Sequence, residues 1–286
     1  MASSATQGIT VAVTGGAGGL GKAIAIAFLE AGSNVAICDL NQDQMALMEK
    51  EWAKNNARIL VSKTDITDEG AVEEFIDSVV AKFGRLDLVV NNAGIIDNFD
   101  PIATTSKASW DKIININLTG TFLTTKSAVN AMQKQPSPGG TIINISSVAS
   151  YRGVNGGLAY TVSKHGIVGL TRNTAGYYGD MGINCIALLI GGMDDTNLGD
   201  NFHAGVNQEA MMRIGAVNPG YVAGKTSVAS QIYPQQARGH SREEVDLFYA
   251  CWADKRENTE KYNLIVRYGN QNLRVLYYSM TLCHPK

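Results

Sequence analysis

Short apolar runs rich in β-branched residues alternate with longer segments of helical pattern from residue 9 to residue 187. Such runs are typical of strands buried on both faces of a parallel sheet, and the segments between them can form the connecting helices. The expected strands are residues 9–13, 34–38, 58–62, 86–90, 141–145 and 183–187. The expected helices are residues 22–29, 42–55, 68–83, 107–134 and 157–177. This alternation predicts an α/β fold with a doubly wound parallel sheet, which binds ligands at the carboxyl ends of its strands.

A glycine-rich turn follows the first expected strand directly. Residues 14–21 read TGGAGGLG and lead into an alanine-rich helical segment that ends at Gly32. Glycines allow a tight turn and let the backbone approach a pyrophosphate, and a helix N-terminus offers N–H groups and a partial positive charge to phosphates. A purely structural loop is the alternative interpretation, but strand, turn and helix in this order favour a Rossmann-type dinucleotide site.

Asp39 ends the second expected strand, where an acidic residue of a dinucleotide-binding fold accepts hydrogen bonds from the adenosine ribose. Its charge would repel the 2′-phosphate of NADP, and the residues that follow it, Leu40 and Asn41, are not basic. The sequence therefore favours NAD over NADP. The alternative is that Asp39 is a solvated loop acid or the N-cap of the helix expected over residues 42–55.

Tyr160 and Lys164 are one helical turn apart in the segment expected to be helical over residues 157–177, and Ser147 precedes them at the end of an expected strand. Positions i and i+4 share a helix face, and a positive charge beside a phenol favours the phenolate. The pattern therefore predicts a group that moves a proton beside the dinucleotide. Taken singly, Tyr and Lys also occur on solvated helix faces, and a serine at such a place also serves as a helix cap.

These residues occur in the order and spacing of a known family. From about residue 8 to residue 198 the chain resembles the single-domain, NAD(P)-dependent short-chain dehydrogenases/reductases, and more weakly so from residue 241 to residue 269. The matching residues are Thr14, Gly15, Gly19, Gly21, Asp65, Asn91, Asn92, Ala93, Gly94, Asn117, Ser147, Tyr160 and Lys164.

The resemblance implies a role for each matching residue. Tyr160 would be the general acid in reduction and the general base in oxidation, and Lys164 would support it and hold the nicotinamide ribose. Ser147 would hydrogen-bond the substrate oxygen, and Asn117 would hold a water that links Lys164 to solvent. The residues that would bind the cofactor are Gly15, Gly19, Leu20, Gly21, Asp39, Asp65, Ile66, Asn91, Ala93, Gly94, Tyr160, Lys164 and Thr196.

The chain departs from the family pattern after the sixth expected strand. Ile190 stands where the family usually has proline before a glycine, which leaves the contact expected from Thr196 less well supported. A Pro-Gly pair does occur at Pro219, but a register that starts there would leave too little chain before the next recognisable helix. Residues 193–225 are expected to form a substrate lid, with Leu198, Phe202, Met211 and Met212 offering either apolar lid surface or core.

The C-terminal part departs further. Residues 241–244 form a capping box, and Val245, Phe248, Tyr249 and Trp252 recur at helical spacing, which predicts a helix. Residues 263–266 are expected to be the edge strand of the parallel sheet. Residues 273–278 have no counterpart in the family and would pair with that strand as a hairpin or pack elsewhere, so residues 270–286 are an extension of unknown role.

Composition agrees with one catalytic domain over residues 1–286, of which 45% are hydrophobic. A net charge of −2 without a basic run argues against nucleic acid and anionic membranes as partners. The N-terminus lacks a signal-peptide core, and the dispersed Cys38, Cys185, Cys251 and Cys283 are typical of thiols in a reducing compartment, so a cytoplasmic location is expected. The histidines show no metal-ligand spacing.

The sequence thus predicts an NAD(H)-preferring oxidoreductase that interconverts a secondary alcohol and a ketone. The intact set of Asn117, Ser147, Tyr160 and Lys164 favours redox chemistry over two alternatives. One is a non-redox isomerase, lyase or cyclase on the same fold, and the other is a catalytically silent binding protein. The resemblance allows a homodimer or homotetramer, although the divergent C-terminus leaves this open.

Overall fold

The structure is a computed structural model that describes residues 8–191, 193, 196, 198, 205–217, 233–234, 247–250, 260–268 and 271–280. Among the described residues, the main sheet has eight strands: two short C-terminal strands lie at the edge beyond β6, and the other six run parallel in the order β3-β2-β1-β4-β5-β6. They are β1 (Thr10–Thr14), β2 (Asn34–Asp39), β3 (Ile59–Lys63), β4 (Leu88–Asn91), β5 (Gly140–Ser147) and β6 (Ile183–Ile190). The chain reverses its direction across the sheet between β1 and β4, which confirms the doubly wound fold and opens a crevice at the carboxyl ends of these strands.

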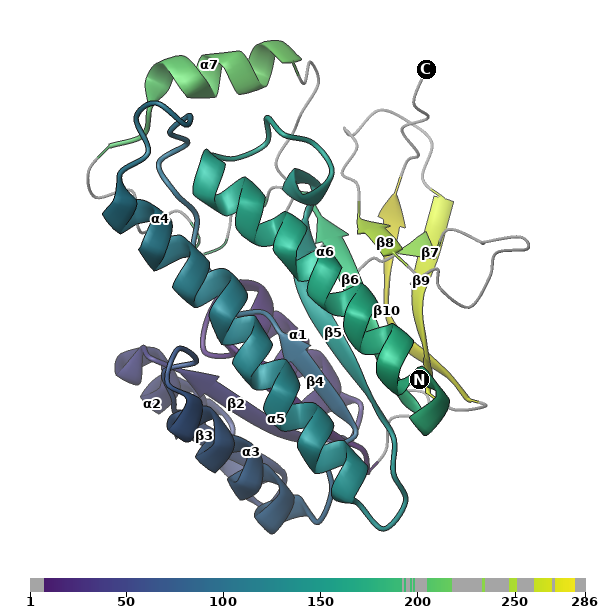
Figure 1. Cartoon of the computed structure of the whole chain (residues 1–286). Coiled ribbons are helices and arrows are strands. Elements are labelled where there is room, and N and C mark those ends of the chain that lie inside the picture. Colours follow the sequence, from purple (N-terminus) through teal and green to yellow (C-terminus); the bar gives the residue numbers. More distant parts are fainter. Residues whose placement is uncertain are drawn as a thin grey trace.

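Helices cover both faces of the sheet, because neighbouring residues of each strand point to opposite sides. Val11 and Val13 of β1 pack with Phe28 on one face, whereas Ala12 packs with Phe75 on the other. The helices are α1 (Gly19–Glu30), α2 (Gln42–Glu51), α3 (Glu69–Phe83), α4 (Lys107–Ile114), α5 (Gly120–Lys134) and α6 (Leu158–Tyr178). In Figure 1, α3, α5 and α6 lie in front of the strands.

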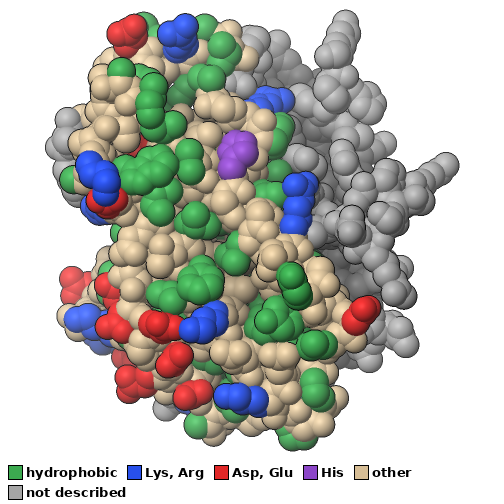
Figure 2. Space-filling view, in the orientation of Figure 1, with side chains coloured by type: hydrophobic (Ala, Val, Ile, Leu, Met, Phe, Trp, Pro, Cys, Tyr) green, Lys and Arg blue, Asp and Glu red, His purple; other side chains and the backbone are tan. Residues whose placement is uncertain are grey.

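Helix α3 shows how the amphipathic pattern is satisfied. Its residues Val72, Phe75, Ile76 and Val79 are buried against the sheet. Figure 2 shows acidic side chains gathered over the part of the surface where α2 and α3 lie. The exposed acids of α3 are Glu69, Glu73, Glu74 and Asp77. The outer face of this helix is therefore charged and solvated, as its spacing predicts.

The helix expected over residues 107–134 is continuous but contains one π-helical turn. That turn, Asn115–Thr119, joins α4 to α5 and carries the buried Asn117. Ser106, Asp68 and Asn41 cap α4, α3 and α2 by accepting a backbone N–H in the first turn of each helix. Asn41, and not Asp39, is therefore the N-cap of α2.

Two expectations for the C-terminal part were wrong. Residues 247–250, expected to be helical, form strand β8 (Leu247–Ala250), which pairs in parallel with β6. A run of four apolar and aromatic residues suits a strand as well as a helix, and the open edge of β6 provides the pairing partner. Val245 and Trp252, from the same predicted stripe, lie outside the described residues. A short strand, β7 (Tyr233–Pro234), pairs antiparallel with β8.

Residues 263–266 do not form the edge of the parallel sheet. They belong to β9 (Glu260–Tyr268), which pairs antiparallel with β10 (Gln271–Met280) in a separate two-stranded sheet. The hairpin considered for residues 273–278 is thus present. Within the expected lid, α7 (Gln208–Val217) is helical and exposes Met211 and Met212, whereas Phe202 and Pro219 lie outside the described residues.

Candidate active site

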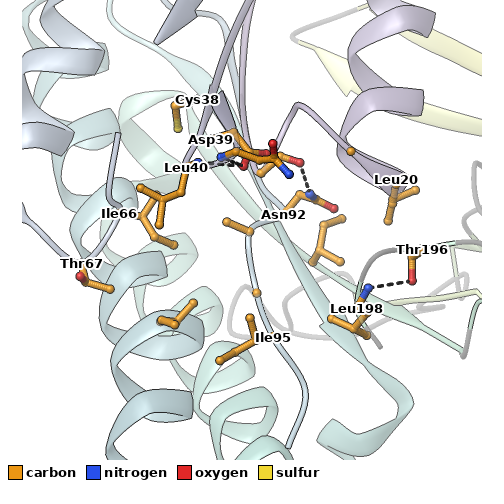
Figure 3. A pocket seen from close by; sticks show the side chains of 18 of the residues that line it. Leu20, Cys38, Asp39, Leu40, Ile66, Thr67, Asn92, Ile95, Thr196 and Leu198 are labelled. Carbon is orange, nitrogen blue, oxygen red and sulfur yellow. Dashed lines mark hydrogen bonds between the residues drawn. The ribbon is translucent and has the colours of Figure 1, made fainter. Parts of the chain in front are cut away.

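A cavity of about 600 Å³ lies at the carboxyl ends of the strands. Its walls come from the glycine turn after β1, the segments after β2, β3 and β4, the ends of β5 and β6, and α6. Figure 3 shows Asp39, Asn92, Ile95 and Leu198, from segments far apart in the sequence, around one space. The sheet therefore gathers the predicted motifs at one place, as its topology requires.

The glycine turn is shaped by close backbone contacts. Gly15 has a φ of 62°, in the left-handed region that favours glycine. A Cβ on Gly21 would overlap the carbonyl oxygen of Gly15, so this position accepts no side chain. The Thr14 hydroxyl accepts the N–H groups of Asn92 and Ala93, each at 3.1 Å, which fixes the segment after β4 against the turn.

Asn92 was not among the predicted cofactor residues, yet it lines the cavity. Its Nδ2 donates to the carbonyl oxygens of Thr14 and Gly15, each at 3.1 Å. Asn91, which was predicted, points away into the core, where its Nδ2 donates to Thr125 and Asn144. The alternation of side chains at the end of β4 decides which of the two asparagines faces the cavity.

Asp39 lies at the wall of the cavity beside the glycine turn (Figure 3). One carboxylate oxygen accepts the Ala17 N–H at 3.0 Å, and the other accepts the N–H groups of Leu40 and Asn41 at 2.8 and 3.0 Å. A carboxylate has about four acceptor positions, so room remains for a hydroxyl donor from a ligand. Asp39 thus holds the turn and presents a negative charge to the cavity.

Tyr160 and Lys164 of α6 both line the cavity and are buried, with 6% and 5% of their surfaces exposed. The Lys164 Nζ donates to the Ile145 carbonyl oxygen of β5 at 3.0 Å. Burial lowers the pKa of Lys164 to about 8, because desolvation disfavours the ammonium. The solvated-face alternative for this pair is therefore wrong.

Asn117 and Ser147 do not line the cavity. The Asn117 side chain accepts the Ile95 N–H and donates to the Ile95 carbonyl oxygen, both at 2.8 Å, and it also donates to the Ser163 hydroxyl. The Ser147 hydroxyl accepts the Ala149 N–H at 3.1 Å. Ser146 lines the cavity instead, with its hydroxyl donating to the Lys164 carbonyl oxygen at 3.1 Å.

Most of the predicted cofactor residues meet at this cavity. Those that line it are Gly15, Gly19, Leu20, Asp39, Asp65, Ile66, Ala93, Gly94, Tyr160, Lys164 and Thr196. Gly21 and Asn91 do not. Ile190, the residue in place of the expected proline, is the last residue of β6 and also lines the cavity.

The prediction missed Asp97, a buried carboxylate beside the N-terminus of α6. Its oxygens accept the N–H groups of Gly157 and Tyr160 at 2.8 and 2.9 Å. The sequence signal was an acidic residue directly after two apolar ones, Ile95 and Ile96, in the segment that follows β4. Charged residues are rarely fully buried unless they are paired, and the backbone N–H groups of α6 are the partners of Asp97.

Comparison with known proteins agrees with this geometry. The family model described as short chain dehydrogenase matches residues 9–207. The chain belongs to the short-chain dehydrogenase/reductase family. It is 42% identical over 219 residues to the short chain dehydrogenase/reductase dpchG of Colletotrichum higginsianum, a match that covers 77% of this chain and 82% of that protein. It is 38% identical over 219 residues to 3beta-hydroxysteroid dehydrogenase 2 of Eggerthella lenta, with the same two coverages of 77% and 82%.

A solved structure of levodione reductase superimposes with a TM-score of 0.68 at 30% sequence identity, covering 78% of this chain and 88% of that one. Family membership makes the chain an oxidoreductase that uses a nicotinamide dinucleotide, NAD or NADP. Among the described residues, no helix has the length and apolarity needed to cross a membrane. Within the same part of the chain, no three His, Cys, Asp or Glu side chains are grouped so as to hold a metal ion.

Proposed function

We propose that this short-chain dehydrogenase/reductase is an NAD(H)-preferring enzyme that interconverts a secondary alcohol and a ketone, with Tyr160 as general acid and base. The observation that carries the proposal is the presence of the buried Tyr160–Lys164 pair in the same cavity as the glycine turn and Asp39. Proton transfer and dinucleotide binding would then occur side by side.

The glycine turn would hold the pyrophosphate of the cofactor, and Asp39 would hold the adenosine ribose. The turn has no Cβ at Gly15 or Gly21, so backbone N–H groups at the start of α1 can approach phosphates closely. The Asp39 carboxylate can accept the ribose hydroxyls and would repel a 2′-phosphate. This is the physical support for NAD over NADP.

Tyr160 would give its phenolic proton to the substrate oxygen in reduction and take it back in oxidation. Lys164 supports this by placing an ammonium near the ring, where positive charge favours the phenolate. A pKa of about 8 lets Lys164 exchange its own proton near neutral pH. When bound, the nicotinamide supplies or accepts the hydride.

Ser147 and Asn117 would play supporting parts. Ser147 follows the cavity-lining Ser146 directly, and its hydroxyl keeps a proton while it accepts the Ala149 N–H, so Ser147 would donate to the substrate oxygen as charge develops there. Asn117 braces the segment after β4 against α6, because it bonds both to Ile95 and to Ser163. Thr196, which lines the cavity and accepts the Leu198 N–H at 3.4 Å, would contact the cofactor.

The apolar wall formed by Ile95, Ile190, Met193 and Leu198 suits a largely hydrocarbon substrate. The names of two relatives, a hydroxysteroid dehydrogenase and levodione reductase, refer to alicyclic compounds. We therefore propose an alicyclic secondary alcohol or ketone as the substrate class. We also propose that the whole chain forms one catalytic domain and that it assembles as a homo-oligomer. A cytoplasmic location is proposed too, and the buried free thiols of Cys38 and Cys185 support it.

The test is hydride exchange by the purified full chain, followed at the absorbance band of reduced nicotinamide. Paired alicyclic alcohols and ketones would be offered with NAD(H) and with NADP(H). We expect turnover with NAD(H) to exceed that with NADP(H). Tight NADH binding without exchange for any pair would favour a non-redox reaction or a silent binding protein, and equal turnover with both cofactors would remove the assigned role of Asp39.

A further inference from the structure

Helix α6 carries Tyr160 and Lys164 but has no N-cap side chain of its own. Its N-cap residue is Gly157, whereas α2, α3 and α4 are each capped by their own Asn, Asp or Ser. Residues of the segment 97–100 instead accept hydrogen bonds from the N–H groups at the start of α6. Asp97 accepts from Gly157 and Tyr160, and the Asp100 carbonyl oxygen accepts from Leu158 at 3.0 Å.

The Asp97 carboxylate occupies the space where a capping side chain would lie. A Cβ added at Gly157 would overlap both of its carboxylate oxygens. Asp97 is 5% exposed, and burial raises its pKa while the N–H groups of Tyr160, Gly157 and Phe99 act against that rise. A buried carboxylate is costly, and a serine or aspartate at position 157 would cap the helix without that cost.

The loop that carries Asp97 is held in an unusual shape. Phe99 has a φ of 66°, a left-handed conformation that residues other than glycine rarely adopt, and its N–H donates to Asp97 at 3.2 Å. Such a conformation persists only where the surrounding contacts impose it. The contacts around the loop therefore hold it in the conformation in which the Asp97 carboxylate accepts hydrogen bonds from α6.

The same loop also packs against the apolar cluster that contains Tyr160. Ile95 and Ile96 contact the small cluster formed by Ile113, Ala149, Ala159 and Tyr160. On another side, a Cβ at Gly156 would lie 2.7 Å from the Tyr160 ring, so the ring fills this space. Residues 95–99 thus contact both the Tyr160 backbone N–H and the apolar cluster that contains the Tyr160 side chain.

We propose that Asp97 is a positioning residue: its buried carboxylate caps α6 from another part of the chain and thereby fixes the place of the Tyr160 phenol in the cavity. This rests on the proposed role of Tyr160. Asp97 does not touch the reacting atoms. It acts through the Tyr160 backbone, and a displacement of about 1 Å in a reacting group is enough to cost about a hundredfold in rate.

Three variants test the proposal in the full-length chain. Asp97→Ala removes the cap. Asp97→Asn keeps one acceptor oxygen but turns an NH2 group toward a backbone donor. Gly157→Ala displaces the carboxylate without changing its chemistry. The control is Asp68→Ala, which removes the N-cap of α3, where the carboxylate accepts the Ala71 N–H at 3.0 Å.

We expect kcat to fall by about tenfold to a hundredfold in the three variants, with the KM and Kd for NADH little changed, because the phenol moves while the glycine turn and Asp39 stay. The control should lose stability but keep kcat. Normal kcat in the folded Asp97 variants would overturn the proposal. Equal losses of NADH affinity and kcat, or failure of all three to fold, would assign Asp97 to stability alone and overturn it too.

Tyr160→Phe separates this proposal from the proposed function. If Tyr160→Phe keeps turnover, the acid–base role fails whatever the Asp97 variants do. If Tyr160→Phe loses turnover and Asp97→Asn does not, only the positioning role fails. In the Tyr160→Phe background, Asp97→Asn should reduce the residual rate little, since the group that it positions is gone. A full additional loss there would overturn the proposal.

Discussion

The Lys164 ammonium nitrogen lies 5.5 Å from the centroid of the Tyr160 ring, and both side chains are buried. The Lys164 hydrogen bond to the Ile145 carbonyl oxygen ties this arrangement to β5. The pair is thereby held between a helix and the sheet, close to the glycine turn. The Lys164 ammonium favours loss of the Tyr160 phenolic proton, and Lys164 itself has a pKa of about 8.

Replacing Tyr160 by Phe keeps the ring and its packing but removes the transferable proton. Turnover should fall by about a hundredfold or more, since general acid–base catalysis usually contributes about a hundredfold to ten-thousandfold. NADH binding, measured by fluorescence titration, should change little. A Tyr160→Phe enzyme with near-normal turnover would show that another group moves the proton.

Asp39→Asn should weaken NAD binding and reduce discrimination against NADP. The amide can keep one acceptor oxygen for the Ala17 N–H, with its NH2 then turned toward the N–H groups of Leu40 and Asn41, and it removes the charge that repels a 2′-phosphate. We expect a loss of about 1.5–3 kcal/mol in NAD affinity, the range for a hydrogen bond to a charged group. Asp43→Asn, an exposed acid in the first turn of α2, is the control. Unchanged cofactor preference in Asp39→Asn would contradict the assignment.

Local patterns were sufficient to predict the parts of the site that depend on neighbouring residues. The i,i+4 spacing of Tyr160 and Lys164 places both on one helix face, and the glycines of residues 14–21 show the tight turn directly. The strands β1 to β6 are apolar runs that the parallel sheet buries on both sides. In each of these cases the residues that determine the local structure lie within a few positions of one another in the chain.

Asp97 and β8 could not be predicted in this way, because their partners are distant. Asp97 bonds to groups 60 and 63 positions further along the chain. Residues 247–250 form a strand because the edge of β6 accepts them, although their spacing also suits a helix. The choice of Ser146 over Ser147 at the cavity depends on side-chain direction where β5 ends, which residue types do not reveal.

Lys164→Met should stabilise the protein at pH 7 while abolishing turnover. The folded pKa of about 8 lies below the ordinary value of 10.5, so below pH 8 the folded state bears the full cost of a buried charge. That cost is about 3 kcal/mol, less about 1 kcal/mol for the lost hydrogen bond to Ile145. Met at this position should therefore gain about 2 kcal/mol in unfolding free energy.

The advantage of Lys164→Met should shrink as pH rises from about 8 to 10.5, where the unfolded chain binds a proton that the folded state has lost. Denaturant unfolding at several pH values measures it. Lys63→Met, at an exposed position, is the control and should show no such change. A difference between Lys164→Met and the parent that does not vary with pH would mean that the charge is not buried in the folded protein.

Three truncations test how the C-terminal strands contribute to the fold. Ending the chain after residue 259 removes β9 and β10 together, and the main sheet keeps every strand pairing that the structure shows for it. Ending it after residue 269 leaves β9 without β10. Ending it after residue 246 also removes β8 and uncovers the edge of β6 from Ala187 to Ile190.

We expect the chain ending at 259 to stay soluble and bind NADH, because a separate hairpin adds no hydrogen bonds to the main sheet. The chain ending at 269 should be more prone to aggregate, since an unpaired strand is a template for association. The chain ending at 246 should lose NADH binding as well, because Ile190 lines the cavity at the uncovered edge. Sedimentation and NADH titration distinguish the three.

If the chain ending at 259 is already unfolded, the hairpin is part of the core. If the chain ending at 246 binds NADH normally, β8 is not needed to shape the cavity.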